Sequence, residues 1–222
     1  MGVKISNPDP GPDAGSNLLP TFAASLAALL AGLVVIFAAT DGGSGFTTEV
    51  LRRTQVARAP QSIPDFTLQD DAGNSTALHQ LLATDEKVWI VDFVYTRCQT
   101  ICSSLGSIYQ QLQQQIQERG LQHKVGLLSI SFDPANDDAA ALRDYASRMR
   151  LDPAVWRVVT LAGVQDRRRL LDAFGIMVVP APLGEFEHNA ALHIVSADGK
   201  LVRIVDYLVP SLALDAALAW QR

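Results

Sequence analysis

The chain contains two cysteines, Cys98 and Cys102, and they stand four positions apart. Because this spacing is close to one helical turn, both sulfur atoms can face a single point in space. Two thiolates placed in this way can bind a soft metal ion, or they can cycle between dithiol and disulfide. The alternative is that both are buried as small apolar side chains. Their place between a strand-like and a helix-like segment favours a functional site.

The residues before the cysteines predict a buried strand, and the residues after them predict a helix. Residues 87–95 are largely β-branched and aromatic with one acid, Asp92, which is typical of a strand buried on both faces. Over residues 102–116 apolar side chains recur at three- and four-residue steps, and Gly120 is a natural stop. Both sulfur atoms are therefore expected at the carboxyl edge of a sheet, where a helix N-terminus and Arg97 favour thiolate.

Strands and helices alternate through the rest of the globular part. Strands are expected at residues 64–68, 124–132, 155–161, 192–196 and 201–206, and helices at residues 77–83, 136–149, up to Phe174, and after a capping Ser211. This order predicts an α/β fold, with helices on both faces of a largely parallel sheet and one antiparallel hairpin. A cysteine pair after the first central strand is typical of a thioredoxin-like fold, although ordinary thioredoxins separate the two cysteines by two residues.

Composition divides the chain into four parts. Residues 1–17 are rich in Pro, Gly, Asp and Asn, and we expect a disordered tail. Residues 18–40 are uncharged and long enough for a transmembrane helix, and a cleaved signal peptide is disfavoured because Lys4 is the only basic side chain before them. Residues 41–61 are expected to be a linker, and residues 62–222 to be one globular domain. The net charge of −5 gives no indication of a nucleic-acid partner.

The charges around the apolar segment give a conflicting signal about its orientation. Arg52, Arg53 and Arg58 follow the segment, so a literal positive-inside count would place the C-terminal part in the cytoplasm. These arginines begin a dozen residues beyond the span, however, and a large following domain weakens the rule.

A metal held by two thiolates would need a third ligand, and the four histidines are the candidates. His79 and His123 are expected on the surface, and His193 lies inside a predicted strand as a packed or edge side chain. His188 follows an irregular loop and leads into the hairpin strand. In a thioredoxin-like fold the segment that enters this strand passes beside the cysteine loop, so His188 can reach both sulfur atoms.

Two thiolates and one imidazole form a soft ligand set of low coordination number. This set suits Cu(I) and can also hold Cu(II). Structural zinc would require a fourth ligand, and the sequence offers no further cysteine. The residue types therefore predict a copper site made by Cys98, Cys102 and His188.

Four motifs together span nearly all of residues 62–206, namely PDFTL from Pro64, DFVYTRCQTIC from Asp92, SFDPANDDAAALRDYA from Ser131 and HNAALHIVSADGK from His188. With these motifs in this order, the sequence resembles the Sco family (also called SenC or PrrC-like), copper chaperones for cytochrome c oxidase assembly. The resemblance implies a thioredoxin-like fold with Cys98, Cys102 and His188 as copper ligands. It also implies donation of copper to the binuclear copper centre of oxidase subunit II, or reduction of that subunit's cysteines.

The resemblance also implies a cellular location and further partners. It favours an N-in, single-pass anchor with the domain outside the cytoplasm. The tail lacks the Arg- and Ser-rich character of a mitochondrial transit peptide, so we expect a bacterial inner membrane with the domain in the periplasm. Other periplasmic copper chaperones or thiol reductants are then possible partners. The sequence departs from the family at Gln99 and Ser103, where proline is usual, and at Glu187, where aspartate is frequent. None of these three positions is an implied ligand.

Three functional hypotheses remain open, and the first is a copper chaperone, which is a binding protein rather than an enzyme. The second is a thiol–disulfide oxidoreductase that uses Cys98 and Cys102 as a redox-active pair. The third is a peroxiredoxin-like peroxidase, which lacks its expected Pro-Thr-x-x-Cys arrangement. Asp92 either orients the cysteine loop from inside a buried strand, where an unpartnered carboxylate is costly, or faces solvent on an edge strand.

Overall fold

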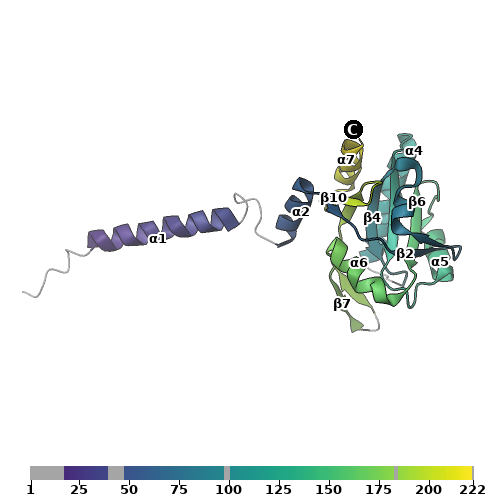
Figure 1. The fold of residues 1–222 in the computed structure, drawn as a ribbon, viewed down its shortest axis with the longest axis horizontal. Helices are drawn as coiled ribbons and strands as arrows, with labels where there is room; N and C mark the ends of the chain where they lie inside the picture. Colours follow the sequence, from purple (N-terminus) through teal and green to yellow (C-terminus); the bar gives the residue numbers. More distant parts are fainter. Residues whose placement is uncertain (1–17, 40–47, 98–100, 183–184, 222) are drawn as a thin grey trace, which may run out of the picture. The chain divides into compact units, whose positions relative to one another are not determined.

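The computed structural model describes residues 18–39, 48–97, 101–182 and 185–221, and at residues 18, 85 and 101–104 it describes the backbone alone. The contacts divide the chain into two compact units, Met1–Arg52 and Arg53–Arg222. The predicted tail, residues 1–17, and Cys98 lie outside the described residues. The first unit contains the apolar helix, and the second is an α/β domain (Figure 1).

The helices are α1 (Leu18–Ala39), α2 (Thr48–Arg58), α3 (Leu78–Leu82), α4 (Ile101–Glu118), α5 (Ala139–Met149), α6 (Arg167–Phe174) and α7 (Pro210–Trp220), with short 3-10 turns η1 (Thr84–Glu86) and η2 (Val164–Asp166). The strands are β1 (Gln61–Ser62), β2 (Thr67–Asp70), β3 (Ser75–Ala77), β4 (Val88–Val94), β5 (Val125–Ser131), β6 (Trp156–Leu161), β7 (Val178–Pro180), β8 (Phe186–His188), β9 (Leu192–Val195) and β10 (Lys200–Val205).

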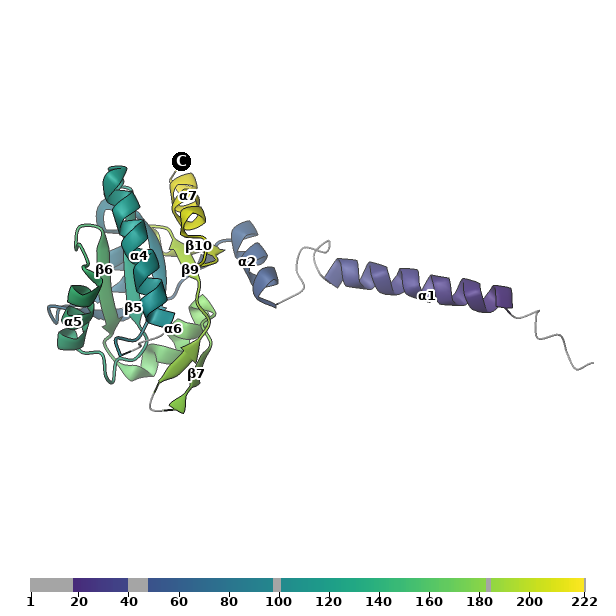
Figure 2. The same cartoon turned by 180° about the vertical axis from the view of Figure 1, so that it is seen from behind.

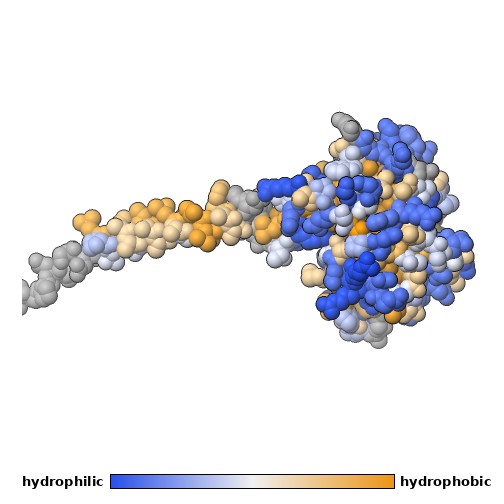
Figure 3. Space-filling model, in the orientation of Figure 1, coloured by the Kyte–Doolittle hydropathy of each residue, from blue (hydrophilic) through white to orange (hydrophobic). Residues whose placement is uncertain are grey.

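Helix α1 is the candidate membrane span. Its segment Leu19–Ala39 has a mean hydropathy of 2.5 and is long enough to cross a bilayer. Apolar side chains cover the face of α1 that is in view in Figure 3, and they are exposed in this unit. A helix that is apolar on all sides needs lipid or protein around it, so its sequence is consistent with an anchor.

The central sheet is mixed, with strand order β1-β10-β9-β4-β5-β6-β2-β3. Strands β4, β5 and β6 are parallel, and every residue of β4 and β5 is buried. Val94 pairs with Ser131 at the ends of β4 and β5, so Tyr95 and Phe132 leave the sheet side by side at its carboxyl edge. This edge is where sites form in open α/β sheets.

Helices cover both faces of the sheet (Figures 1 and 2). Helix α4 packs on the face that Asp92 enters, and the hydroxyl of Tyr109 donates to the Ile90 carbonyl at 2.9 Å. The next residue of β4, Phe93, points to the opposite face and contacts Phe174 of α6 at 4.8 Å between ring centroids. Because β4 is a central strand and Asp92 is fully buried, the edge-strand interpretation of Asp92 is wrong.

Two segments that composition marked as irregular contain regular structure. Within the predicted linker, residues 48–58 form α2, and its Val56 is fully buried in the domain core. The compact unit therefore begins at Arg53, ahead of the predicted start at residue 62. In the predicted loop before His188, residues 178–180 and 186–188 pair as the separate antiparallel hairpin β7–β8.

The last helix begins differently from the prediction. Ser211 was expected to cap it, but α7 starts at Pro210 and its cap position is Val209, which makes no side-chain capping bond. Proline suits the first helical position because its φ angle is already helical and its missing N–H would have no partner there. Helix α7 therefore begins at Pro210, and Ser211 is not its cap.

Candidate metal centre

Two of the three predicted ligands lie on described elements near the carboxyl edge of the sheet, and Cys98 lies outside the described residues. His188 is the last residue of β8, and Cys102 is the second residue of α4. Among the described residues, no group of three His, Cys, Asp or Glu side chains could hold a metal ion. That finding does not test the predicted set, because the side chains of Cys98 and Cys102 are not described.

A buried carboxylate fixes the residues that lead to Cys98. Asp137 accepts hydrogen bonds from the Thr96 backbone N–H at 2.9 Å and from the Thr96 hydroxyl at 2.7 Å. It also accepts from the Ser131 hydroxyl at 2.5 Å. Since Asp137 and Ser131 are fully buried, these charge-assisted bonds tie the end of β4 to the loop after β5.

Two arginine side chains also hold the same segment, one through an ion pair and one through a hydrogen bond to the backbone. Arg97 donates to Asp133 at 3.1 Å, and Arg148 of α5 donates to the Thr96 carbonyl at 2.8 Å. Asn136 also donates to both carboxylate oxygens of Asp133. Asp133 therefore holds Arg97 and Asn136 together on the loop after β5. Asp137 was missed, because nothing local distinguishes it from the capping aspartate beside it.

The hairpin β7–β8, which carries His188, is held against the same edge by an aromatic cluster. The ring of Phe186 lies 5.3 Å from that of Tyr95 and 5.7 Å from that of Phe132. The guanidinium of Arg167 lies 4.8 Å from the Phe186 ring, within cation–π range. The Tyr95 hydroxyl makes a very short bond to the Glu185 carboxylate and accepts from the Phe186 N–H at 3.2 Å. Together these contacts join the hairpin to the residue three positions before Cys98.

The imidazole of His188 is oriented by a backbone carbonyl. Its Nδ1 lies 3.1 Å from the Asn189 carbonyl oxygen, which can only accept, so Nδ1 carries the proton and Nε2 has the lone pair. A metal-binding histidine typically donates the N–H of its other ring nitrogen to a carbonyl or carboxylate in this way. The ring lies 5.3 Å from that of Phe132, which also contacts Tyr95, so the imidazole is at the edge that leads to Cys98.

The other three histidines lie elsewhere, as the sequence predicted. His79 is exposed on α3, with Nε2 2.8 Å from the Ile63 carbonyl, and His123 is exposed after α4. His193 is fully buried in β9, between the rings of Phe93 at 5.6 Å and Phe174 at 5.5 Å. Of the four histidines, His188 is the one whose ring contacts Phe132 of the cluster around Tyr95, so it is the candidate ligand at this edge.

Asp92 is a second unusual carboxyl, and it lies beneath α4. Burial raises its pKa from 3.8 to about 7, and the nearby hydroxyls of Ser129 and Tyr109 offset only part of that rise. Neither carboxyl oxygen has a hydrogen bond of good geometry among the described residues. Asp92 therefore holds or releases a proton near neutral pH, on the strand that leads to Cys98.

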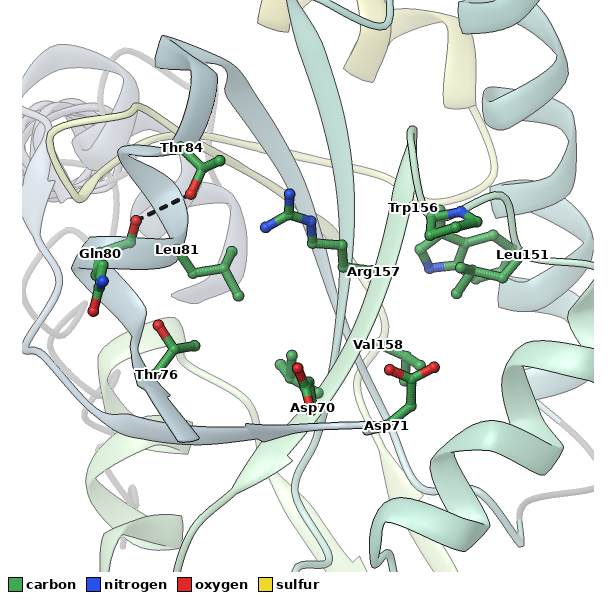
Figure 4. Close-up of a pocket in the computed structure, with 12 residues that line it drawn as sticks. Asp70, Asp71, Thr76, Gln80, Leu81, Thr84, Leu151, Trp156, Arg157 and Val158 are labelled. Atoms are coloured by element: carbon green, nitrogen blue, oxygen red, sulfur yellow. Dashed lines mark hydrogen bonds between the residues drawn. The ribbon is translucent and has the colours of Figure 1, made fainter. Parts of the chain in front are cut away.

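A cavity of ≈ 440 Å³ lies at the opposite side of the sheet, between α3, β3 and β6. Figure 4 shows the guanidinium of Arg157 pointing into it toward Leu81 and Thr84, with Asp70 and Asp71 at its base. Its lining offers oxygen and nitrogen groups but no sulfur or imidazole, and it contains no described residue of the hairpin. It is therefore not a site for a soft metal ion.

Replacing Tyr95 with Phe tests whether the aromatic cluster positions His188. The variant keeps the ring contacts and removes the hydroxyl bonds to Glu185 and Phe186. We expect faster amide hydrogen exchange in β7–β8 and copper affinity about 10-fold weaker, the usual range for loss of an outer-shell support. Tyr109→Phe is the matched control, because its hydroxyl bonds to Ile90 in the core. Equal effects of the two variants would contradict a positioning role for Tyr95.

Comparison with known proteins agrees with this geometry. The sequence model of the family described as SCO1/SenC matches residues 54–220. The SCO1 protein homolog of Bacillus subtilis (strain 168) is 26% identical over 179 residues, which cover 79% of this chain and 84% of that protein. The match begins at residue 54, within α2.

Solved structures share the fold. The structure of BsSco, described with a disulfide switch and as a member of the Sco family of cytochrome c oxidase assembly proteins, has a TM-score of 0.59 at 24% identity, covering 72% of this chain and 95% of that one. Bradyrhizobium japonicum ScoI with copper bound has a TM-score of 0.56 at 22% identity, covering 71% and 98%. The predicted thioredoxin-like α/β fold is confirmed. With three quarters of its length matched by the family model, the chain belongs to the SCO1/SenC family.

Proposed function

We propose that this protein is a membrane-anchored copper chaperone that binds copper through Cys98, Cys102 and His188. It would deliver the ion to the binuclear copper site of cytochrome c oxidase subunit II. Copper is then a cargo, carried as Cu(I) or Cu(II), and the protein is a binding protein rather than an enzyme. The observation that carries the proposal is the clamp of the His188 hairpin onto Tyr95, three residues before Cys98.

The donor set fits a cargo of soft metal ions. Two thiolates and a neutral imidazole suit Cu(I), and a set of three leaves room for a ligand from an acceptor protein. The Asn189 carbonyl fixes the His188 tautomer so that Nε2 can bind the ion. Family members that bear on the proposal include ScoI, solved with copper bound, and BsSco, described among oxidase assembly proteins.

The proposed location is a bacterial inner membrane, with α1 as a single N-in span and the domain in the periplasm. The arginines after the span are a weaker counter-argument than their number suggests. Arg52 pairs with Glu49 at 3.7 Å, and Arg53 pairs with Asp206 of the domain at 3.8 Å. The arginines begin a dozen residues beyond the span, and a large domain that follows them weakens the positive-inside rule. Activity of a C-terminal reporter only in the cytoplasm would overturn this placement.

The copper content of the reduced full-length protein in detergent tests the ligand set. We expect one copper ion per chain. We also expect His188→Ala to lower copper affinity at least about 100-fold, because loss of a residue that only supports a metal ligand already lowers metal affinity by up to about 100-fold. His123→Ala is the matched control, because His123 is an exposed histidine away from the proposed site. Competition with a chromophoric Cu(I) chelator measures the copper affinity of the parent, of His188→Ala and of His123→Ala.

The result would also separate the proposal from its alternative. Copper binding that does not depend on His188 would favour a thiol–disulfide oxidoreductase that keeps the cysteines of a copper-protein partner reduced. The observation in favour of that alternative is the buried Asp92, a proton-holding group on the strand that leads to Cys98. In that case Cys98 and Cys102 would act as a redox pair, and reduction of a partner disulfide would be the activity to measure.

A further inference from the structure

An apolar groove lies between α2, β10 and α7, on the side where the chain enters the domain. It has a volume of ≈ 600 Å³, and its apolar lining consists of Ala57, Val202, Ile204, Val205, Leu212, Ala216, Ala219 and Trp220. Figures 1 and 2 show α2 beside β10 and α7 in both views. Four charged residues complete the lining, namely Arg53, Arg203, Asp206 and Asp215.

Large apolar side chains extend the groove onto the surface. Leu208 is 69% exposed, Leu212 is 54% exposed and Trp220 is 45% exposed. Leu212 and Trp220 lie eight residues apart on α7, so they share one stripe of the helix with Ala216 between them. The other two tryptophans, Trp89 and Trp156, are 1% and 0% exposed. Two large, exposed apolar side chains on one stripe of a helix beside an apolar groove are typical of a surface that binds a protein or a membrane.

The chain itself brings a membrane to this surface. Helix α1 ends at Ala39 and α2 begins at Thr48, so residues 40–47 alone connect them. Eight residues span at most about 30 Å in any conformation. The end of the span can therefore never be farther than this from the first residue of α2. Such a short tether gives a high effective concentration, so that even a weak contact with lipid is populated.

The charges around the groove suit the surface of a bilayer. Arg203 is exposed, and Arg53 is paired with Asp206 at 3.8 Å. With Asp215, the groove is lined by two cations and two anions. Long arginine side chains such as that of Arg203 can reach lipid phosphates from an apolar surface. Tryptophan is the side chain most typical of the boundary between headgroups and acyl chains. This combination of side chains matches an interfacial contact.

We infer that the face formed by Leu212, Trp220 and Arg203 rests on the headgroup region of the bilayer that holds α1. This inference rests on the proposed membrane anchor and is independent of copper binding. The occupant of the groove is lipid, because the span keeps lipid within reach and the exposed residues are of interfacial type. The contact restricts tumbling of the domain and holds the β7–β8 hairpin at a defined height above the membrane.

Fluorescence of Trp220 tests the contact in the full-length protein. The chain is placed in nanodiscs of phosphatidylcholine and phosphatidylglycerol, with or without bromine on the acyl chains. Bromine quenches an indole at the acyl-chain boundary but not the two tryptophans buried in the domain. We expect brominated lipid to remove most of the Trp220 emission, which is the part of the signal that Trp220→Phe lacks.

Matched surface variants show whether the groove makes the contact. Leu212→Glu is expected to abolish the quenching of Trp220. Val164→Glu is expected to preserve it, because Val164 is an equally exposed apolar residue, at 60%, outside the groove. Both positions are exposed, so neither change should unfold the domain.

The remaining outcomes each overturn the inference in a recognisable way. If the protein is incorporated into the nanodisc but Trp220 is not quenched, the anchor is present and the proposed contact of the domain with lipid is absent. A blue shift of Trp220 emission without quenching, seen only with two chains per disc, would make a second copy of the chain the occupant. Chain that does not co-purify with lipid would remove both anchor and contact, and the copper proposal would still be decided by His188→Ala.

Discussion

Replacing Asp92 with Asn is expected to raise the free energy of unfolding of the unit Arg53–Arg222 by about 4 kcal/mol near pH 8. Burial raises the pKa of Asp92 from 3.8 to about 7 in the folded domain. Between those two values the folded state holds a proton that the unfolded state has released. Stability therefore falls as pH rises through this window and is level above it. Asparagine is neutral and nearly isosteric with aspartate, so the stability of the variant should not fall as pH rises through this window.

Urea unfolding of parent and variant between about pH 4 and pH 8 measures this effect. The two proteins should be similar at the acid end and should diverge steadily toward pH 7. Asp198→Asn is a control of opposite sign, because hydrogen bonds from Lys200 and Ser196 lower the pKa of Asp198. The contribution of Asp198 is present above its unfolded pKa and is lost as pH falls through the folded value. Parallel profiles for the parent and Asp92→Asn would show that Asp92 is not protonated in the folded state.

The same variant addresses the role of Asp92 in copper exchange. Asp92 lies on the central strand that ends at Val94, immediately before the clamped Tyr95–Arg97 segment. Because Asp92 lowers the stability of the domain at neutral pH, we expect it to have a role in the proposed copper site that follows β4. We therefore predict that Asp92→Asn changes the rate of copper release. An unchanged rate would confine the effect of Asp92 to stability. Asp92→Asn should remain folded, since it removes a buried charge rather than a packed group.

The architecture was predictable wherever a single segment carried its own periodicity. The run of apolar residues in β4 and the three- and four-residue repeat of α4 each specify an element without reference to the rest of the chain. The parallel order of β4, β5 and β6 then follows from the alternation of strands and helices. The place of His188 at the edge of the sheet where β4 ends followed from the fold class, because topology brings that segment to this edge.

The supports of the site were not predictable, because they join distant residues. Asp137 bonds to Thr96, which lies 41 positions away, and Tyr95 bonds to Glu185, 90 positions away. No periodicity marks such pairs, since each member alone looks like a loop acid or a strand aromatic. The hairpin β7–β8 was missed for a related reason. Its strands have three residues each, too few for alternation to appear, and Pro180 argues against a strand.

Removing the carboxylate of Asp137 is expected to destabilise the domain by about 4 kcal/mol, because three hydrogen bonds to a buried charged acceptor are lost at once. The Thr96 N–H and hydroxyl and the Ser131 hydroxyl would be left without their acceptor in a buried site. Urea unfolding of Asp137→Ala provides the measurement.

Asp138→Ala is a close control for this substitution. Asp138 is the adjacent residue, it is exposed, and its side chain caps α5 by accepting from the Ala140 and Ala141 N–H groups. Loss of such a cap costs about 1 kcal/mol. If both variants lost the same stability, the buried network around Asp137 would have no special role.

The functional consequence of Asp137→Ala follows from the position of Thr96, two residues before Cys98. With the network intact, Thr96 is fixed from one side by Asp137 and from the other by Arg148. Without Asp137 the loop keeps only its exposed contacts, and Cys98 is less well positioned relative to His188. We therefore expect copper affinity to fall by about 10- to 100-fold in Asp137→Ala, measured below the temperature at which the variant unfolds, and to be unchanged in Asp138→Ala. Loss of stability with unchanged copper affinity would mean that bound copper orders the loop by itself.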